Sequence, residues 1–141
     1  MKTQEFEIVL EYIKDLSAET PDVQTLIFVR NNISKYQMNI DIKSKAVKNK
    51  MVEVTTKLTF EDKDKNKMKS FFELSYGTII KLKEEINEKK KLEKILLCDL
   101  QKIVYPKIEK IFLEIIRNAG YPEIKFEKKV DFDKLYNQRF N

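Results

Sequence analysis

The sequence predicts an α+β domain in which one long helix packs on a four-stranded antiparallel sheet. Four segments alternate apolar and polar residues with the two-residue period of a β-strand. A longer segment follows in which apolar residues recur every three or four positions, as in an amphipathic helix. Consecutive strands with short links favour a meander, and its apolar face requires a covering layer. We expect the long helix to be that layer.

Composition indicates one domain, residues 1–141, because a chain of 141 residues that is 42% hydrophobic and 36% charged has the size and balance of a single core. No apolar run is long enough to span a membrane. The N-terminal residues carry carboxylates where a secretory signal would be apolar. The single cysteine, Cys98, lies in a helical apolar pattern and is expected to be a buried thiol. We therefore expect a cytoplasmic protein.

Residue types that catalysis and cofactor binding require are missing. The chain has no histidine, which excludes Ser-His-Asp and Cys-His catalytic sites and every zinc site that uses histidine. Its two glycines, Gly77 and Gly120, cannot form a glycine-rich phosphate-binding loop. We predict that the protein is not an enzyme, with no catalytic residues, no metal site and no cofactor.

The first strand is expected to begin at Phe6 and to end before Pro21, which lacks the backbone donor that a sheet needs. Alternation assigns one face to Phe6, Ile8, Leu10 and Tyr12, and we expect that face to be buried. It assigns the other face to the carboxylates Glu7, Glu11 and Asp15. Residues 22–34 then contain an apolar run, Leu26–Val29, without a clean period, and we expect an irregular segment.

Three further strands are predicted at residues 35–45, 51–60 and 67–80, the last with Gly77 at a bulge or a close backbone approach. The long helix covers the apolar positions from Leu92 to Ile116. Pro106 should kink this helix or divide it in two. Its apolar stripe is wider than one sheet face requires, which favours contact with a second subunit. Gly120 and Pro122 should end it, and Asp131 can cap a short final helix.

Three segments resemble the signatures of one family. Residues 12–21 read YIKDLSAETP and are similar to YxKDxSxExP, the opening signature of the SecB family of protein-export chaperones. Residues 130–136, VDFDKLY, are similar to the family's closing V-[ND]-F-[DG]-x-L-[FY]. Tyr105 and Pro106 match an aromatic–proline pair inside the family's main helix. Because the three occur in family order across residues 6–136, the chain resembles a SecB-like chaperone.

This resemblance implies an ATP-independent chaperone, a holdase that binds unfolded proteins in hydrophobic grooves and competes with their aggregation by mass action. Residues 22–34 and 121–129 correspond to the family's crossover and helix-connecting segments, which form two walls of a peptide groove. The residues expected to bind clients are Leu26, Phe28, Tyr36, Met38, Ile124 and Phe126. For each of these side chains, packing in the core is the alternative.

The resemblance also implies contacts with two further proteins. It aligns four residues with the acidic patch through which SecB-type chaperones dock on the SecA motor: Asp15, Glu19, Phe71 and Glu73. A solvated face is the alternative for the carboxylates, but a phenylalanine on a charged face favours an interface. It aligns Phe72, Leu74 and Tyr76 with the inward face that helps to build the family's homotetramer, a dimer of dimers. We expect neither a nucleic-acid partner nor membrane insertion.

Several departures from the family pattern leave the role open. The net charge is +5, with −3 on residues 1–30 and +8 on the remainder, whereas family members are usually acidic. Ala18 stands where an aromatic residue is common, and an acidic C-terminal tail is missing. Some SecB-like chaperones instead bind the antitoxin of a toxin–antitoxin–chaperone system. Export and antitoxin control both remain possible roles, and the alternatives from other classes are a basic nucleic-acid-binding module and a purely structural oligomer.

Overall fold

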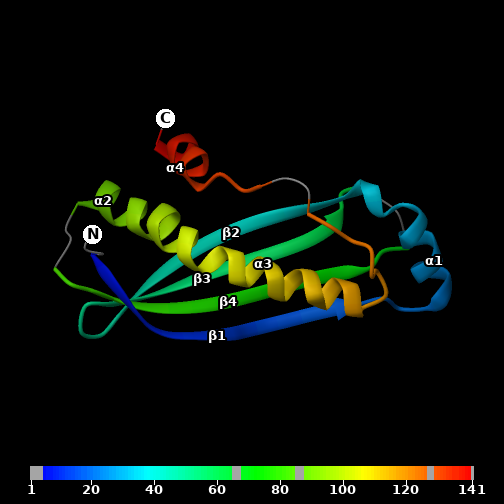
Figure 1. The fold of residues 1–141 in the computed structure, drawn as a ribbon, viewed down its shortest axis with the longest axis horizontal. Helices are drawn as coiled ribbons and strands as arrows, with labels where there is room; N and C mark the ends of the chain where they lie inside the picture. Colours follow the sequence, from blue (N-terminus) through cyan, green and yellow to red (C-terminus); the bar gives the residue numbers. More distant parts are fainter. Residues whose placement is uncertain (1–4, 65–67, 85–87, 127–128, 141) are drawn as a thin grey trace.

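The computed structural model describes residues 5–64, 68–84, 88–126 and 129–140, and it confirms the predicted fold class (Figure 1). A long helical segment lies across one face of a four-stranded antiparallel sheet, and a short helix follows near the C-terminus. The elements in chain order are β1 (Phe6–Glu19), α1 (Val23–Asn31), a 3₁₀ turn (Ile33–Lys35), β2 (Tyr36–Val47), β3 (Met51–Asp62), β4 (Phe71–Leu82), α2 (Lys89–Lys94), a π-helical turn (Ile95–Asp99), α3 (Leu100–Asn118) and α4 (Phe132–Phe140). None of the helices in the described ranges combines the length and hydropathy that a membrane span requires.

The strand order is β1-β4-β3-β2, and every neighbouring pair is antiparallel. β2, β3 and β4 form the predicted meander. β1, however, pairs with β4 and not with β2, because α1 and the 3₁₀ turn carry the chain past the end of the sheet (Figure 1). β1 ends at Glu19, before Pro21, as predicted. The start of the predicted fourth strand, at Lys67, lies outside the described residues.

Two irregularities in β1 change which of its side chains face the helix. The pairing with β4 shifts register between Ile8 and Leu10, and again between Ile13 and Asp15. A bulge moves every following side chain to the opposite face. Leu10 and Tyr12 are consequently exposed, Leu10 to 60%, and the prediction that both are buried is wrong.

The bulge also moves Glu11, but in the opposite direction, from the outer face of the sheet to the face beside the helix. Its carboxylate was predicted on the outer face, but Tyr76 Oη, on the helix side, donates a hydrogen bond to Glu11 Oε1 (3.2 Å). Lys107 Nζ of α3 lies 3.6 Å from the same oxygen. Tyr12 Oη points the opposite way and donates to Glu53 Oε1 of β3 (3.1 Å). The first bulge therefore removes Leu10 and Tyr12 from the face beside α3 and places the Glu11 carboxylate on that face.

The core lies between the inner face of the sheet and the long helical segment. Its members alternate along β3 and β4 and recur every three or four residues along α3: Val54, Leu58, Phe72, Leu74, Tyr76, Ile80, Leu100, Val104, Ile108, Phe112 and Ile116. Each aliphatic or aromatic side chain buried to this extent stabilises the fold by roughly 1.5–3 kcal/mol. Inside this layer Gln101 Nε2 donates to Thr56 Oγ1 (2.9 Å), which fixes the position of the helix on the sheet.

The helical segment is irregular at its start and not at its proline. α3 continues through Pro106 to Asn118, so the predicted division there is not observed. The π-helical turn lies earlier, where Ile95 and Cys98 and the two leucines between them are all buried. Four consecutive residues can be buried because the sheet covers one side of this turn and α4 the other (Figure 1).

Residues 22–34 are helical, not irregular as the sequence suggested. Asp22 caps α1 by accepting a hydrogen bond from the backbone N–H of Thr25 (2.7 Å). α1 reaches the C-terminal end of α3, where Gly120 has a φ of +121°. A methyl group at Gly120 would lie 2.8 Å from Leu26 Cδ1. Gly120 therefore meets two demands at once, a left-handed backbone and a close approach of α1.

Replacing Gly120 by alanine should destabilise the protein by roughly 1–3 kcal/mol, because alanine is strained at this φ and its Cβ would collide with Leu26. Urea denaturation followed by circular dichroism measures the effect. In a Leu26→Ala background the same substitution should lower the free energy of unfolding by less, because the collision with Leu26 is removed and only the backbone strain at residue 120 is left. Equal costs in both backgrounds would show that the contact is unimportant.

Candidate functional site

A hollow of about 340 Å³ lies between the end of α1 and the segment that follows α3. Its lining is Arg30, Ile33, Tyr121, Pro122, Glu123, Ile124 and Lys125. Ile33, Tyr121 and Ile124 give it an apolar base, while the charged side chains form its rim. The hollow joins the two segments that the sequence predicted as walls of one groove.

Hydrogen bonds hold the wall that follows α3. Arg117 Nε donates to the carbonyl of Ile124 (3.1 Å), and the N–H of Tyr121 donates to the carbonyl of Ile116 (3.3 Å). The hydroxyls of Tyr121 and Ser70 lie 2.7 Å apart. A segment that turns at Pro122 and Glu123 and is fastened to the helix and to the start of β4 can act as a preformed wall.

Ser70, which is buried, connects this wall to the two residues that flank the opposite segment, Thr20 and Tyr36. Its N–H donates to Tyr36 Oη (3.0 Å), and its hydroxyl also lies 2.7 Å from that of Thr20 at the end of β1. Tyr36 is itself buried, and burial raises the pKa of its hydroxyl. The burial of Tyr36 in this structure favours the alternative of core packing for this predicted client residue.

The other predicted client residues divide between the hollow and the core. Ile124 lines the hollow. Leu26 and Phe28 are half-buried on α1 and pack against the core. Met38 is half-buried on β2, and its Sδ accepts a hydrogen bond from Tyr105 Oη (3.7 Å).

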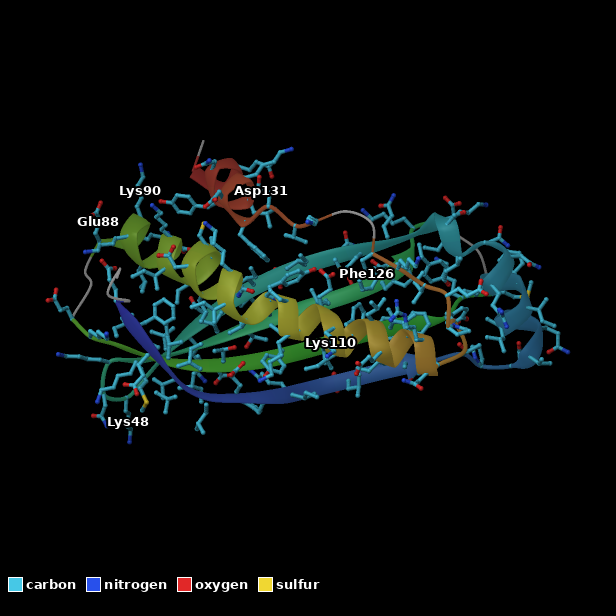
Figure 2. All side chains as sticks on the ribbon, viewed as in Figure 1. Lys48, Glu88, Lys90, Lys110, Phe126 and Asp131 are labelled. Carbon is cyan, nitrogen blue, oxygen red and sulfur yellow. The ribbon has the colours of Figure 1, made fainter. Side chains whose placement is uncertain are left out.

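Phe126 belongs to an aromatic cluster above the sheet (Figure 2). Its ring centroid lies 5.5 Å from that of Phe60 and 6.1 Å from that of Phe112. Both partners are buried, and Phe126 itself is half-buried. It anchors the chain after the hollow, and only its exposed part is available to a ligand.

Sequence reasoning missed the most exposed apolar residues of α1. Val23 and Ile27 lie one helical turn apart and are 59% and 57% exposed. Arg30 continues the same helical face into the rim of the hollow. Pro21 and Asp22 are typical of a helix start, but the uninterrupted apolar run that follows, Leu26–Val29, hides the helical period.

The four residues predicted to dock a partner share one end of the outer sheet face. In the pairing of β1 with β4, Glu19 lies opposite Phe71 and Asp15 lies opposite Ser75. Glu73, between them on β4, forms an ion pair with Lys57 of β3, and this pair raises the pKa of Lys57. Phe71 is 39% exposed among these charges. The structure thus brings Asp15, Glu19, Phe71 and Glu73 onto one surface.

Phe72, Leu74 and Tyr76 were predicted at an oligomer interface, but they lie under α3 in the core of one chain. They have almost no exposed surface and cannot contact a second subunit in this conformation. Exposed apolar side chains are concentrated on β1 instead: Val9, Leu10, Tyr12, Ile13 and Leu16. The outer edge of β1 has no neighbouring strand within the described residues.

Cys98 is buried beneath α4, where its Sγ donates to the carbonyl of Phe132 (3.3 Å). Burial raises the pKa of the thiol to about 11, so it is protonated and unreactive at neutral pH. Within the described residues no three side chains of histidine, cysteine, aspartate or glutamate are grouped as a metal site would require.

Comparisons with known proteins agree with this geometry. The family model described as "Preprotein translocase subunit SecB" matches residues 1–141. A relative from Pelagibacter ubique, named "Putative protein-export protein SecB", is 52% identical over 99% of each chain. A relative from Jannaschia, named "Protein-export protein SecB", is 30% identical and covers 94% of this chain and 78% of its own.

Among solved structures, the fold is similar to that of a SecB-like chaperone from Mycobacterium tuberculosis, solved in complex with a peptide from the HigA1 antitoxin. The TM-score is 0.62, the identity is 9%, and the match covers 89% of this chain and 91% of the other. At that identity the likeness is one of fold.

Proposed function

The chain belongs to the SecB family, and from this premise we propose that it is an ATP-independent holdase for unfolded or partly folded proteins. The observation that carries the proposal is the hollow between α1 and residues 121–125. Its apolar base and charged rim suit an extended chain whose apolar side chains enter and whose backbone stays near solvent. Binding needs no nucleotide, since a holdase acts by mass action on the unfolded state.

The exposed face of α1 extends this binding surface beyond the hollow. Val23 and Ile27 continue the apolar lining of Ile33 and Ile124 along the helix. Such a surface has few directional contacts, so it can accept many sequences with modest affinity. Promiscuous binding of this kind is what a chaperone for diverse clients requires.

Of the two roles, we propose protein export. The relative that is 52% identical along its whole length carries an export name, whereas the antitoxin-bound chaperone is 9% identical. Antitoxin control is the second candidate, favoured by the fold likeness to that complex. Co-purification with SecA or with an antitoxin distinguishes the two.

We propose that Asp15, Glu19, Phe71 and Glu73 form the docking surface for SecA. An apolar side chain surrounded by carboxylates is suited to a partner with a basic, partly apolar surface. Because Glu73 is already paired with Lys57, Asp15 and Glu19 are the carboxylates best suited to attract such a partner.

We further propose that the chain assembles as a homotetramer through β1 and the exposed side of α3. β1 combines an open edge with exposed apolar residues on both faces, an arrangement that would aggregate if it stayed uncovered. Ile103 on α3 adds a further exposed apolar side chain. Pairing of β1 edges and packing of helix faces would produce a dimer of dimers.

Ile27→Asp should weaken client binding about fivefold or more, because a carboxylate replaces an exposed apolar contact beside the hollow. Suppression of aggregation of an unfolded test protein, with its Kd, measures the change. Val47→Asp, at the opposite end of the molecule, is the matched control and should leave the Kd within twofold. If the two substitutions weakened client binding equally, or if neither weakened it, the hollow would not be the client-binding site.

The double substitution Asp15→Lys and Glu19→Lys should weaken SecA binding at least tenfold, since two attractive charges become repulsive. Isothermal titration calorimetry with purified SecA provides the Kd, and client binding should be unchanged. Glu84→Lys together with Glu88→Lys makes the same change in charge at exposed residues at the other end of the molecule, and this control should have little effect. SecA affinity that survives the double substitution would place docking elsewhere.

Ile13→Lys together with Leu16→Lys should convert the oligomer to smaller species, because two cations would be buried in the β1 contact. Light scattering coupled to gel filtration gives the mass. Leu135→Lys changes a similarly exposed leucine on α4 and should preserve the oligomer. An unchanged mass in the β1 variant contradicts the proposed interface without affecting the holdase assay.

A further inference from the structure

Several lysine-bearing segments meet at the end of the molecule opposite α1. Backbone hydrogen bonds join the β2–β3 hairpin to the end of β4, where the N–H of Leu82 donates to the carbonyl of Lys50 (3.0 Å). The N–H of Lys83 donates to the carbonyl of Glu5 before β1 (3.0 Å), and Lys91 Nζ of α2 lies 3.6 Å from the Glu5 carboxylate. Figure 2 shows the same end, with Lys48 on the hairpin and Glu88 and Lys90 at α2. We call this surface the basic end.

Charge is unevenly distributed along the long axis. The described residues of the basic end contain ten lysines: Lys43, Lys45, Lys48, Lys50, Lys81, Lys83, Lys89, Lys90, Lys91 and Lys94. Against them stand the six carboxylates Glu5, Glu7, Glu53, Glu84, Glu88 and Glu93. One carboxylate, Glu53, and one lysine, Lys43, form ion pairs with residues outside the set, Lys14 and Asp41 respectively, so the excess of lysines is unchanged by these two pairs. The proposed SecA surface, at the far end of β1 and β4, carries carboxylates instead.

The tip of the hairpin keeps a lysine where the backbone favours glycine. Asn49 and Lys50 both have a φ of 63°, and the N–H of Met51 donates to the carbonyl of Lys48 (3.4 Å). This is a tight hairpin turn with two left-handed residues, the second of which is usually glycine. A side chain in that region strains the backbone, and such strain is often associated with function. Val47, 39% exposed, adds an apolar residue beside these lysines.

The type of charge indicates the type of partner. All ten cations are lysines, which act as flexible point charges and do not provide the planar fork that reads base edges. The segments 43–50, 81–84 and 88–94 contain no aromatic side chain on which a base could stack. Clustered lysines with an exposed apolar residue are suited to a layer of phosphate headgroups.

We propose that the basic end docks the protein reversibly on the anionic phospholipid headgroups of a bilayer. Lys48, Lys50 and Lys83 would contact headgroup phosphates, and Val47 would reach the interface without inserting a span. Such contact would leave α1, the hollow and the carboxylate surface at the opposite end facing away from the bilayer. The proposal is independent of the holdase function, because it needs no client and no SecA.

Vesicle flotation of the full chain tests this proposal. The protein should bind vesicles of phosphatidylcholine with 40% phosphatidylglycerol at 50 mM salt, and should not bind pure phosphatidylcholine. Binding should weaken at least tenfold at 300 mM salt, because the screening length shortens. Lys48→Glu, Lys50→Glu and Lys83→Glu combined should abolish it. Lys35→Glu, Lys63→Glu and Lys110→Glu combined make the same change in charge elsewhere and should retain most of it.

A single substitution separates binding from folding. Lys50→Gly removes one charge and relieves the left-handed strain, so it should raise the urea midpoint while weakening vesicle binding. The proposal is overturned if anionic vesicles are not bound at low salt, or if the two triple variants lose binding equally. It is also overturned if duplex DNA is bound, is released by the basic-end substitutions, and vesicles are not bound, since the partner would then be a nucleic acid.

Discussion

Burial of one sheet face beneath one long helix is the constraint on which the rest of the structure depends. The inner faces of β3 and β4 are buried, and Phe112, the largest fully buried side chain of the helix, belongs to the same core cluster as Phe72 and Leu74. A single helix is too narrow to cover four strands. The inner face of β1 is consequently left open beyond the helix, and β2 is only partly covered. The exposed apolar surface used in the proposals follows from this geometry.

Much of the fold could be predicted from the sequence, because strand and helix periods are local properties. Three of the four strands and the main helix follow their apolar repeats. The faces of β1 could not be assigned between its two bulges, from Leu10 to Ile13, since a bulge depends on the partner strand and leaves no mark in the alternation itself. The order of the sheet was missed for a related reason: α1, hidden in the apolar run after Pro21, moves β1 beside β4.

The candidate site was predictable in its segments but not in its side chains. The two walls meet as expected, yet Tyr36 and Phe126 turn toward Ser70 and Phe60, because aromatic groups gain more from a packed cluster than from solvent. Ile27, one position away from two predicted residues, is exposed instead. On a helix a shift of one position rotates a side chain by about 100°. An apolar segment whose helical period is not recognised therefore does not reveal which of its side chains are exposed.

Surface charge can be redistributed in this fold at little cost to stability. The ion pairs of Lys102 with Asp133 and of Lys91 with Glu5 join exposed side chains, and pairs of that kind contribute little to the free energy of unfolding. The core, by contrast, is mostly apolar, and polar groups buried in it, such as Gln101 with Thr56 and Ser70 with Tyr36, are hydrogen-bonded to one another. Because exposed ion pairs contribute so little, the concentration of lysines at one end is not explained by ion pairing within the chain. Charge substitutions there, and at Asp15 and Glu19, should accordingly report on binding and not on unfolding.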